Sequence, residues 1–327
     1  MNLNNKTLLI TGIGDFIGWR TAEMAIEQGM QVRGLEVSPE KAKKAEDLGL
    51  QVVIGSTNDE EALLSACEGV DIVFHAAAKN DAGGSIEMFR KINVEGTANT
   101  VKVAKKAGVK TFIHLSSVMV YGFKFPDQIT EEGPLRGENN PFCQTKIESE
   151  SEVLKFNTPT DFGVIIIRAG DIYGPDAVAW VLRPLQLMQK KKFVLINGGS
   201  GICNHIYIDN LIDAIFLAIE KEAYGEIFNI TDGCNTIWKE YYTRLAEIAG
   251  YSKPSVSMPA FVAKTAIRQM GKNADVYPES IDFVTRPHTY SIEKAKRTLG
   301  YEPKINLDEG MTRVAKWLQN NHSAFAS

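Results

Sequence analysis

The chain has 327 residues, of which 44% are hydrophobic and 23% charged, and its formal net charge is −4. This mild acidity argues against a nucleic-acid or anionic-membrane surface, and no apolar run reaches the roughly 18–20 residues of a membrane span. The N-terminus lacks the regions of a signal peptide, and the four cysteines and five histidines are scattered. We therefore expect a cytoplasmic protein with reduced thiols and no metal site.

The first two-thirds of the chain alternates between short β-branched runs and amphipathic helical patterns. Several runs are almost continuously apolar, as strands buried on both faces are. The alternation predicts an α/β fold, with a Rossmann-type doubly wound parallel sheet and helices on both faces. The expected strands are Thr7–Thr11, Gln31–Glu36, Gln51–Ile54, Ile72–Ala76, Thr111–Ser116 and Gly163–Arg168. The expected helices between them are Trp19–Gln28, Pro39–Leu48, Asn58–Cys67, Phe89–Ala107 and Pro141–Phe156.

After Arg168 the alternation loosens, and turn signals become frequent. We expect a Rossmann core over residues 1–175 and 203–232. A smaller, mostly helical substrate lobe is expected over residues 176–202 and 233–327. The later expected elements are a helix at Asn210–Lys221, a strand at Glu226–Ile230, and helices at Thr236–Ala249, Ser291–Leu299 and Leu307–Asn320.

A glycine-rich turn follows the first expected strand and reads Thr11-Gly12-Ile13-Gly14-Asp15-Phe16-Ile17-Gly18. Backbone N–H groups and the dipole at a helix start favour a phosphate, and glycines let a pyrophosphate approach the main chain. Glu36 ends the second expected strand, where a carboxylate accepts hydrogen bonds from an adenosine ribose and repels a 2′-phosphate. The pattern predicts a dinucleotide site that favours NAD over NADP. The alternative is a tight strand–helix turn with a surface glutamate.

These residues resemble the extended short-chain dehydrogenase/reductase family, whose loop is Thr-Gly-x-x-Gly-x-x-Gly. The resemblance continues in order through Val70–Ala78, Asn93–Thr97, Arg168–Pro175, Asn204–Leu211 and Glu293–Pro303. Within the family, the chain is similar to the branch of NAD-dependent epimerase/dehydratases and 3β-hydroxysteroid dehydrogenase-like enzymes. It implies a homodimer that forms through the long helices near 89–107 and 141–156.

Two cofactor positions depart from the family pattern. Asp15 stands at the middle glycine, where a carboxylate crowds and repels a pyrophosphate, although the neighbouring Gly14 lets the loop relax. Ser56 stands where the family usually has an aspartate near the adenine. The resemblance implies that the cofactor contacts come from Gly12, Gly14, Asp15, Phe16, Ile17, Gly18, Glu36, Ser56, Ala76, Ala77, Ala78, Lys146 and Ala169.

The resemblance also implies a catalytic group. Ser117 corresponds to the family's catalytic serine, and Lys146 to the lysine that holds the nicotinamide ribose and lowers the pKa of a tyrosine. Phe142 stands at the position of that tyrosine, one helical turn before Lys146. Phenylalanine has no ionisable group and cannot pass a proton to or from the carbinol oxygen. Substrate contacts are expected from Ser117, Val118, Tyr173 and Trp180.

Four interpretations of Phe142 are open. In the first, Phe142 is an inactivating substitution introduced into an enzyme. In the second, the protein catalyses a different reaction, in which the fold binds and polarises a carbonyl. In the third, Phe142 belongs to a non-catalytic sensor or binding module, and in the fourth, the proton comes from elsewhere: Tyr121, Tyr173, Cys143 or water.

The first hypothesis on function is an NAD-dependent oxidoreductase that transfers hydride to or from a secondary alcohol or ketone. Apolar lobe residues, Val178, Trp180, Val181, Leu182 and Leu185, lean toward a lipid-like substrate. The alternatives are a nucleotide-sugar epimerase/dehydratase and a non-catalytic dinucleotide-binding or regulatory protein.

Overall fold

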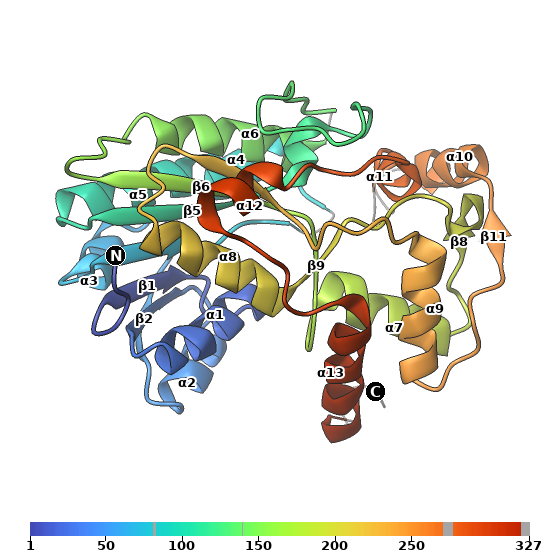
Figure 1. Ribbon diagram of the computed structural model, residues 1–327, viewed down its shortest axis with the longest axis horizontal. Coiled ribbons are helices and arrows are strands. Elements are labelled where there is room, and N and C mark those ends of the chain that lie inside the picture. The colour runs from blue at the N-terminus through green and yellow to red at the C-terminus, as the bar shows by residue number, and fades with distance from the viewer. Residues whose placement is uncertain (81–82, 139, 271–276, 322–327) are drawn as a thin grey trace.

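The computed structural model describes residues 1–80, 83–138, 140–270 and 277–321 (Figure 1). In these residues a seven-stranded parallel sheet has the order β10-β6-β5-β4-β1-β2-β3. The order reverses between β1 and β4, which places a crevice at the carboxyl ends of these strands. The predicted α/β fold with a parallel Rossmann-type sheet is confirmed. The strands are β1 (Thr7–Thr11), β2 (Gln31–Glu36), β3 (Gln51–Ile54), β4 (Ile72–His75), β5 (Thr111–Ser117), β6 (Gly163–Ala169) and β10 (Ile227–Ile230).

Helices cover both faces of this sheet because its strands bury apolar side chains on both. Along β1, Leu8 and Ile10 belong to one core cluster and Leu9 to the other. The first face packs against α1 (Phe16–Glu27) and α8 (Ile208–Glu220). The second face packs against α3 (Glu60–Cys67), α5 (Gly96–Lys106) and α6 (Pro141–Leu154). Two further core helices are α2 (Pro39–Glu46) and α4 (Ile86–Arg90).

The remaining elements form a lobe beside the sheet's carboxyl edge (Figure 1). Two short parallel strand pairs, β7–β9 and β8–β11, connect them. Although α12 lies late in the chain, it packs on the core, since Lys294 Nζ lies 5.3 Å from the ring centroid of Phe228 in β10. The lobe elements are β7 (Asp171–Tyr173), α7 (Arg183–Gln189), β8 (Leu195–Ile196), β9 (His205–Tyr207), α9 (Trp238–Ile248), β11 (Ser257–Met258), α10 (Ala260–Met270), α11 (Ser280–Thr285) and α13 (Leu307–Asn320), with α12 at Glu293–Leu299.

The predicted bounds are close where the pattern is strong. β1, β2 and β3 have the expected ends, β4 ends one residue early, and β5 and β6 each extend one residue further. The helix expected over Phe89–Ala107 forms a continuous helical segment that begins earlier, at Ile86, and contains the π-helix η1 (Lys91–Glu95) between α4 and α5. Apolar periodicity does not reveal one extra residue in a turn. Within the described ranges, no helix has both the length and the apolar character to cross a membrane.

Candidate functional site

The glycine loop joins β1 to α1 at the crevice. Gly12 has φ +71°, a conformation that favours glycine, and a Cβ there would lie 3.2 Å from the Cα of Ala77. A Cβ on Gly18 would lie 2.3 Å from the carbonyl oxygen of Gly12, so the helix can approach the loop only with glycine there. The side chain of the N-cap residue, Asp15, makes no capping hydrogen bond to α1, so the first N–H groups of the helix can bind an anion.

Asp15 is the residue that departs from the family loop, and its side chain turns outward. The carboxylate is 63% exposed and pairs with Lys41 Nζ of α2 at 2.5 Å. This hydrogen bond raises the pKa of Lys41. The expected repulsion between Asp15 and a pyrophosphate is therefore weakened, because the negative charge is neutralised on the outer side of the loop.

Glu36 fixes the same loop from the end of β2. Its side chain is buried, and its two carboxylate oxygens accept hydrogen bonds from the N–H groups of Gly14 and Ser38, each at 3.0 Å. A Cβ on Gly14 would lie 2.9 Å from Glu36 Oε2 and 2.5 Å from the Cβ of Lys41, so the glycine at 14 is structurally required. Ser56, after β3, accepts a hydrogen bond from the N–H of Asn58 at 3.1 Å.

A polar relay supports the segment after β4, where Ala76, Ala77 and Ala78 lie. Thr11 Oγ1 contacts His75 Nδ1 at 2.9 Å and accepts a hydrogen bond from the Ala77 N–H at 3.2 Å. His75 Nε2 contacts Thr97 Oγ1 at 2.9 Å. Burial lowers the pKa of His75 to about 3, so the imidazole is neutral. This relay was not predicted from the sequence, although Thr11 and His75 both end strands at the crevice and are partners in the β1–β4 register.

Asn93 lies within the π-helix and holds the following segment in place. Its Oδ1 accepts from the Lys79 N–H at 2.7 Å, and its Nδ2 donates to the Lys79 carbonyl at 3.0 Å and to Thr145 Oγ1 at 3.1 Å. A π-helix often marks a functional segment. Here it turns an amide toward the connection after β4 and toward α6.

The predicted catalytic positions come from β5 and α6. Ser117 ends β5, and its Oγ accepts a hydrogen bond from the Met119 N–H at 3.2 Å, which leaves the hydroxyl hydrogen free to donate. Lys146 is only 5% exposed and donates from Nζ to the Leu115 carbonyl at 2.7 Å. Burial lowers the pKa of Lys146 to about 8, against a smaller opposing effect of Glu150. The ring centroid of Phe142 lies 5.9 Å from Lys146 Nζ.

A buried ion-pair network lies under these residues. Glu150, one turn after Lys146, binds the Arg168 guanidinium through Nε at 3.0 Å and Nη2 at 2.7 Å, and also accepts from Ser116 Oγ. Arg168 Nη1 donates to the Tyr121 hydroxyl at 2.7 Å, which in turn donates to Asn229. This network was not predicted from the sequence, where its signal is the charged Arg168 at the end of the apolar Val-Ile-Ile-Ile run.

Three residues considered as alternative proton donors are placed unfavourably. Burial raises the pKa values of Tyr121 and Cys143 to about 12, and the Tyr121 hydroxyl is already committed to Asn229. Tyr173 is also buried, which raises its pKa, and its hydroxyl has no hydrogen-bond partner among the described residues. Each of these groups therefore fits a packing or network role.

The predicted substrate contacts are separated in the fold. Val118 is buried in a small core cluster with Tyr121. Tyr173 is also buried and packs edge-on against Tyr241, with 5.6 Å between ring centroids. Substrate contacts by these two residues stay a prediction. Trp180 is partly buried and stacks on Phe283 at 5.8 Å. Ser117 lies at the carboxyl end of β5, and Ala169, its register partner in β6, is buried.

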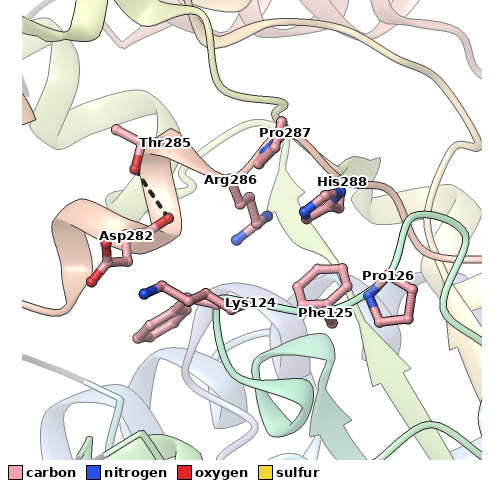
Figure 2. A pocket seen from close by; sticks show the side chains of 9 residues that line it. Lys124, Phe125, Pro126, Asp282, Thr285, Arg286, Pro287 and His288 are labelled. Atoms are coloured by element: carbon pink, nitrogen blue, oxygen red, sulfur yellow. Dashed lines mark hydrogen bonds between the residues drawn. The ribbon is translucent and has the colours of Figure 1, made fainter.

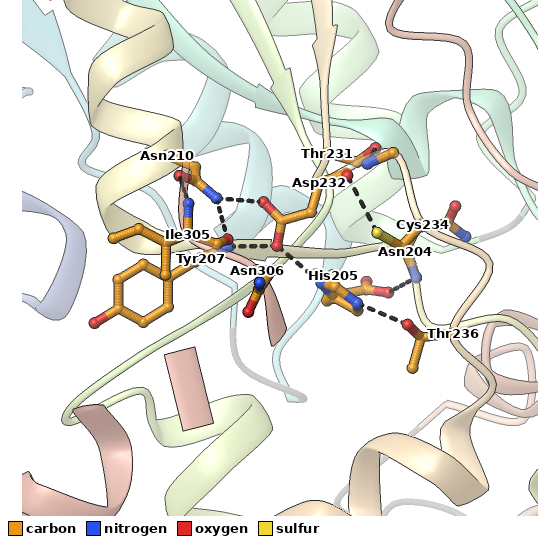
Figure 3. A network of polar contacts seen from close by, with 12 residues as sticks. Asn204, His205, Tyr207, Asn210, Thr231, Asp232, Cys234, Thr236, Ile305 and Asn306 are labelled. Carbon is orange, nitrogen blue, oxygen red and sulfur yellow. Dashed lines mark hydrogen bonds and ion pairs between the residues drawn. The ribbon is translucent and has the colours of Figure 1, made fainter. Parts of the chain in front are cut away.

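A second polar network joins the end of β10 to the lobe (Figure 3). Asp232 contacts His205 Nδ1 at 2.8 Å and accepts from Asn210 Nδ2 at 2.7 Å. His205 Nε2 contacts Thr236 Oγ1 at 2.9 Å, and Asn210 also donates to the Ile305 carbonyl at 2.8 Å. These bonds fix β9, α8 and the chain before α13 to one carboxylate. In the described part of the chain, no cluster of three His, Cys, Asp or Glu side chains could hold a metal ion.

The model of the NAD dependent epimerase/dehydratase family matches residues 8–231. This chain belongs to that family. The match begins in β1 and ends just after β10, so it covers the whole parallel sheet and the predicted catalytic positions. The resemblance stated from the motifs is confirmed.

Proteins that are similar in sequence to this epimerase/dehydratase family member include reductases. One is the 4-hydroxy-2-methyl-3-oxo-4-farnesyl-3,4-dihydroquinoline-1-oxide ketoreductase of Stigmatella aurantiaca, 28% identical over 92% of this chain and 93% of that protein. Another is the 2-alkyl-3-oxoalkanoate reductase of Stenotrophomonas maltophilia, 29% identical over 94% and 98%. A solved UDP-glucose 4-epimerase of Thermotoga maritima has the same fold, with 24% identity and a TM-score of 0.79 over 97% and 99% of the two chains.

Proposed function

We propose that this epimerase/dehydratase family member is an NAD-dependent oxidoreductase that interconverts a ketone and a secondary alcohol. The observation that carries the proposal is the joint placement of Ser117 and the buried, pKa-lowered Lys146, with Phe142 one turn away. The names of two relatives, a ketoreductase and a 3-oxoalkanoate reductase, support a carbonyl substrate.

The residues at the crevice fit NAD. The glycine loop and the uncapped start of α1 would hold the pyrophosphate, Glu36 the adenosine ribose, and Lys146 the nicotinamide ribose. A buried carboxylate at Glu36 would repel the 2′-phosphate of NADP. When bound, the nicotinamide supplies or accepts the hydride.

The remaining chemistry is the handling of a carbonyl oxygen and a proton. The Ser117 hydroxyl would donate a hydrogen bond to the substrate oxygen and hold it in place. Phe142 cannot supply the proton, and Tyr121, Tyr173 and Cys143 are buried with raised pKa values. Lys146 has a pKa near working pH, so its ammonium would supply the proton through water, less effectively than a tyrosine positioned at residue 142 would.

The proposed substrate is a ketone or alcohol on a lipid-like skeleton. The names of the two relatives contain a farnesyl or an alkyl group beside the oxo group. In this chain, the partly buried Trp180 packs against the buried rings of Trp238 and Phe283 in the lobe. Trp180 would offer an apolar contact, which suits an alkyl or ring skeleton better than a nucleotide sugar.

The test starts with calorimetric titration of NADH and NADPH. Micromolar NADH binding, weaker for NADPH, is expected from Glu36. Turnover of medium-chain ketones by NADH is then compared between the wild-type protein and Phe142→Tyr, with Phe142→Leu as a variant that restores no proton donor. Since a positioned acid contributes about 10²–10⁴-fold, Phe142→Tyr should raise the rate by that order and Phe142→Leu should not.

Contrary results would separate the alternatives. Absence of binding of either cofactor would exclude the oxidoreductase and leave a scaffold. NADH binding without turnover in Phe142→Tyr would support a regulatory dinucleotide-binding protein. Micromolar binding of UDP, which is part of the UDP-glucose in the solved Thermotoga maritima epimerase, would support the nucleotide-sugar alternative.

A further inference from the structure

A cavity of about 470 Å³ opens between the segment that follows Ser117 and the lobe helix α11 (Figure 2). One wall is Phe123 to Pro126, which continues the chain beyond β5. The other wall is Asp282 of α11 with Thr285 to His288. The cavity therefore joins the chain that follows Ser117 and the short helix after β5 to the lobe.

Arg286 points into this ring of side chains and is incompletely paired (Figure 2). Its side chain is fully buried, with Nη2 donating to Asp171 at 2.7 Å and the guanidinium 3.7 Å from the ring centroid of Phe283. Nε and Nη1 have no hydrogen-bond partner among the described residues. These two nitrogens carry three N–H bonds, and buried donors without an acceptor are costly.

The position of Arg286 is tied to the candidate active site. Asp171 lies two residues beyond Ala169, which is the register partner of Ser117 in the sheet. The Asp171 carboxylate also accepts from the Asn204 N–H at 3.0 Å. The ion pair therefore fixes the guanidinium to the sheet edge that carries Ser117.

The charged side chains that line the cavity include two cations, Lys124 and Arg286, and one carboxylate, Asp282, while the Asp127 carboxylate lies close by and binds Thr289, next to His288. Lys124 has no ion-pair partner in the described part of the chain, whereas Asp282 is paired with Lys264 at 2.6 Å. His288 contributes a ring that packs against Phe125 at 5.5 Å between centroids. Two aromatic side chains, Phe123 and Phe125, complete an apolar wall. The lining therefore combines hydrogen-bond donors with apolar surface.

We propose that this cavity binds a carboxylate on the substrate, with Arg286 and Lys124 as its recognition residues and Ser117 at the ketone or alcohol. This inference rests on the proposed function and narrows its substrate class to oxo or hydroxy acids with an apolar chain. A carboxylate fits better than a diphosphate, because only one unpaired lysine adds to an arginine already half neutralised by Asp171.

The test measures binding by the fluorescence of Trp180 and Trp238, which pack beside Phe283 and so report on the guanidinium stacked on it. The probes are 3-hydroxydecanoate and its methyl ester, at fixed NADH. The wild-type protein should bind the acid at least about tenfold more tightly than the ester, as a charge-assisted hydrogen bond in a buried site provides.

Three variants test whether Lys124 and Arg286 cause the preference for the acid over the ester. Lys124→Gln should weaken acid binding several-fold and leave ester binding unchanged, whereas Lys253→Gln, whose lysine pairs with Glu247 elsewhere in the lobe, should change neither. Arg286→Gln combined with Asp171→Asn removes both members of the buried pair and so avoids an unpaired charge. This double variant should abolish the preference for the acid.

Equal binding of acid and ester, or a preference that survives the double variant, would overturn the proposal. So would displacement of the acid by inorganic phosphate or UDP at lower concentration than by decanoate. Oxidation of both alcohols at equal efficiency would overturn the carboxylate site while the oxidoreductase stands. Tight acid binding without turnover, even in Phe142→Tyr, would overturn the oxidoreductase proposal while the carboxylate site stands.

Discussion

Replacement of Glu150 by glutamine is expected to destabilise the protein strongly. The Glu150–Arg168 pair is almost fully buried, with side chains 3% and 2% exposed, and joins two nitrogens of the guanidinium to one carboxylate. Glutamine removes the charge and turns an amide toward the cation. Leaving a buried ion without its partner costs about 3–5 kcal/mol. For 327 residues this corresponds to a fall in Tm of about 4–7 °C.

The same helix provides a matched control. Glu148 binds Arg90 through two nitrogens at 2.9 and 2.8 Å, but the side chains are 26% and 47% exposed. Glu148→Gln should therefore cost at most about 1 kcal/mol in thermal or denaturant unfolding. Equal losses for Glu148→Gln and Glu150→Gln would refute the reasoning, because geometry without burial would then set the energy.

The same substitution should also shift the pH dependence of catalysis. Glu150 opposes the lowering of the Lys146 pKa, so Glu150→Gln should move that pKa below about 8. If the Lys146 ammonium supplies the proton, ketone reduction is full below this pKa and falls as pH rises through it. The break in a profile of kcat against pH should lie near 8 in the wild-type protein and in Glu148→Gln, and lower in Glu150→Gln. An unchanged break would show that Lys146 is not the acid.

Two further expectations concern the cofactor loop and the assembly. Gly14→Ala should weaken NADH binding by about tenfold or more in calorimetry, since its Cβ would meet Glu36 and Lys41, whereas Asp15→Gly should change it by less than about threefold; equal effects would mean that Asp15 faces the cofactor. The protein should also be a homodimer through α5 and α6, with twice the 36.1 kDa chain mass by light scattering; a 36.1 kDa species would contradict this.

The sequence predicts the fold well because its signals are local. Apolar runs bounded by turn residues place most of the sheet within one residue, and a glycine turn before a helix locates the crevice. The direction of the Asp15 side chain depends on Lys41, which lies on another helix, and no local pattern carries that information. The same holds for strands of two or three residues in the lobe, which are too short to show a period.

The residues of the candidate site also fall into those that the sequence predicts and those that depend on tertiary packing. Ser117, Phe142 and Lys146 could be predicted as a group because the family resemblance gives them fixed places in one strand and one helix. The burial of Tyr173 could not be predicted, because a tyrosine beside a turn gives no sign of whether its hydroxyl faces a ligand or the core. Arg286 and Asp171 are separated by 115 residues, so their pairing depends on how the lobe docks on the sheet.

The catalytic effect of residue 142 and the binding effect of the cavity should appear in different kinetic constants. Loss of a positioned acid costs about 10²–10⁴-fold in the chemical step. A carboxylate held by Arg286 contributes about 10–150-fold in binding, the equivalent of a charge-assisted hydrogen bond. Binding of that kind is present before and during hydride transfer, so it lowers KM without restoring kcat. The gain in Phe142→Tyr should therefore appear in kcat, with KM for the acid nearly unchanged, and a gain confined to KM would show that residue 142 acts in binding.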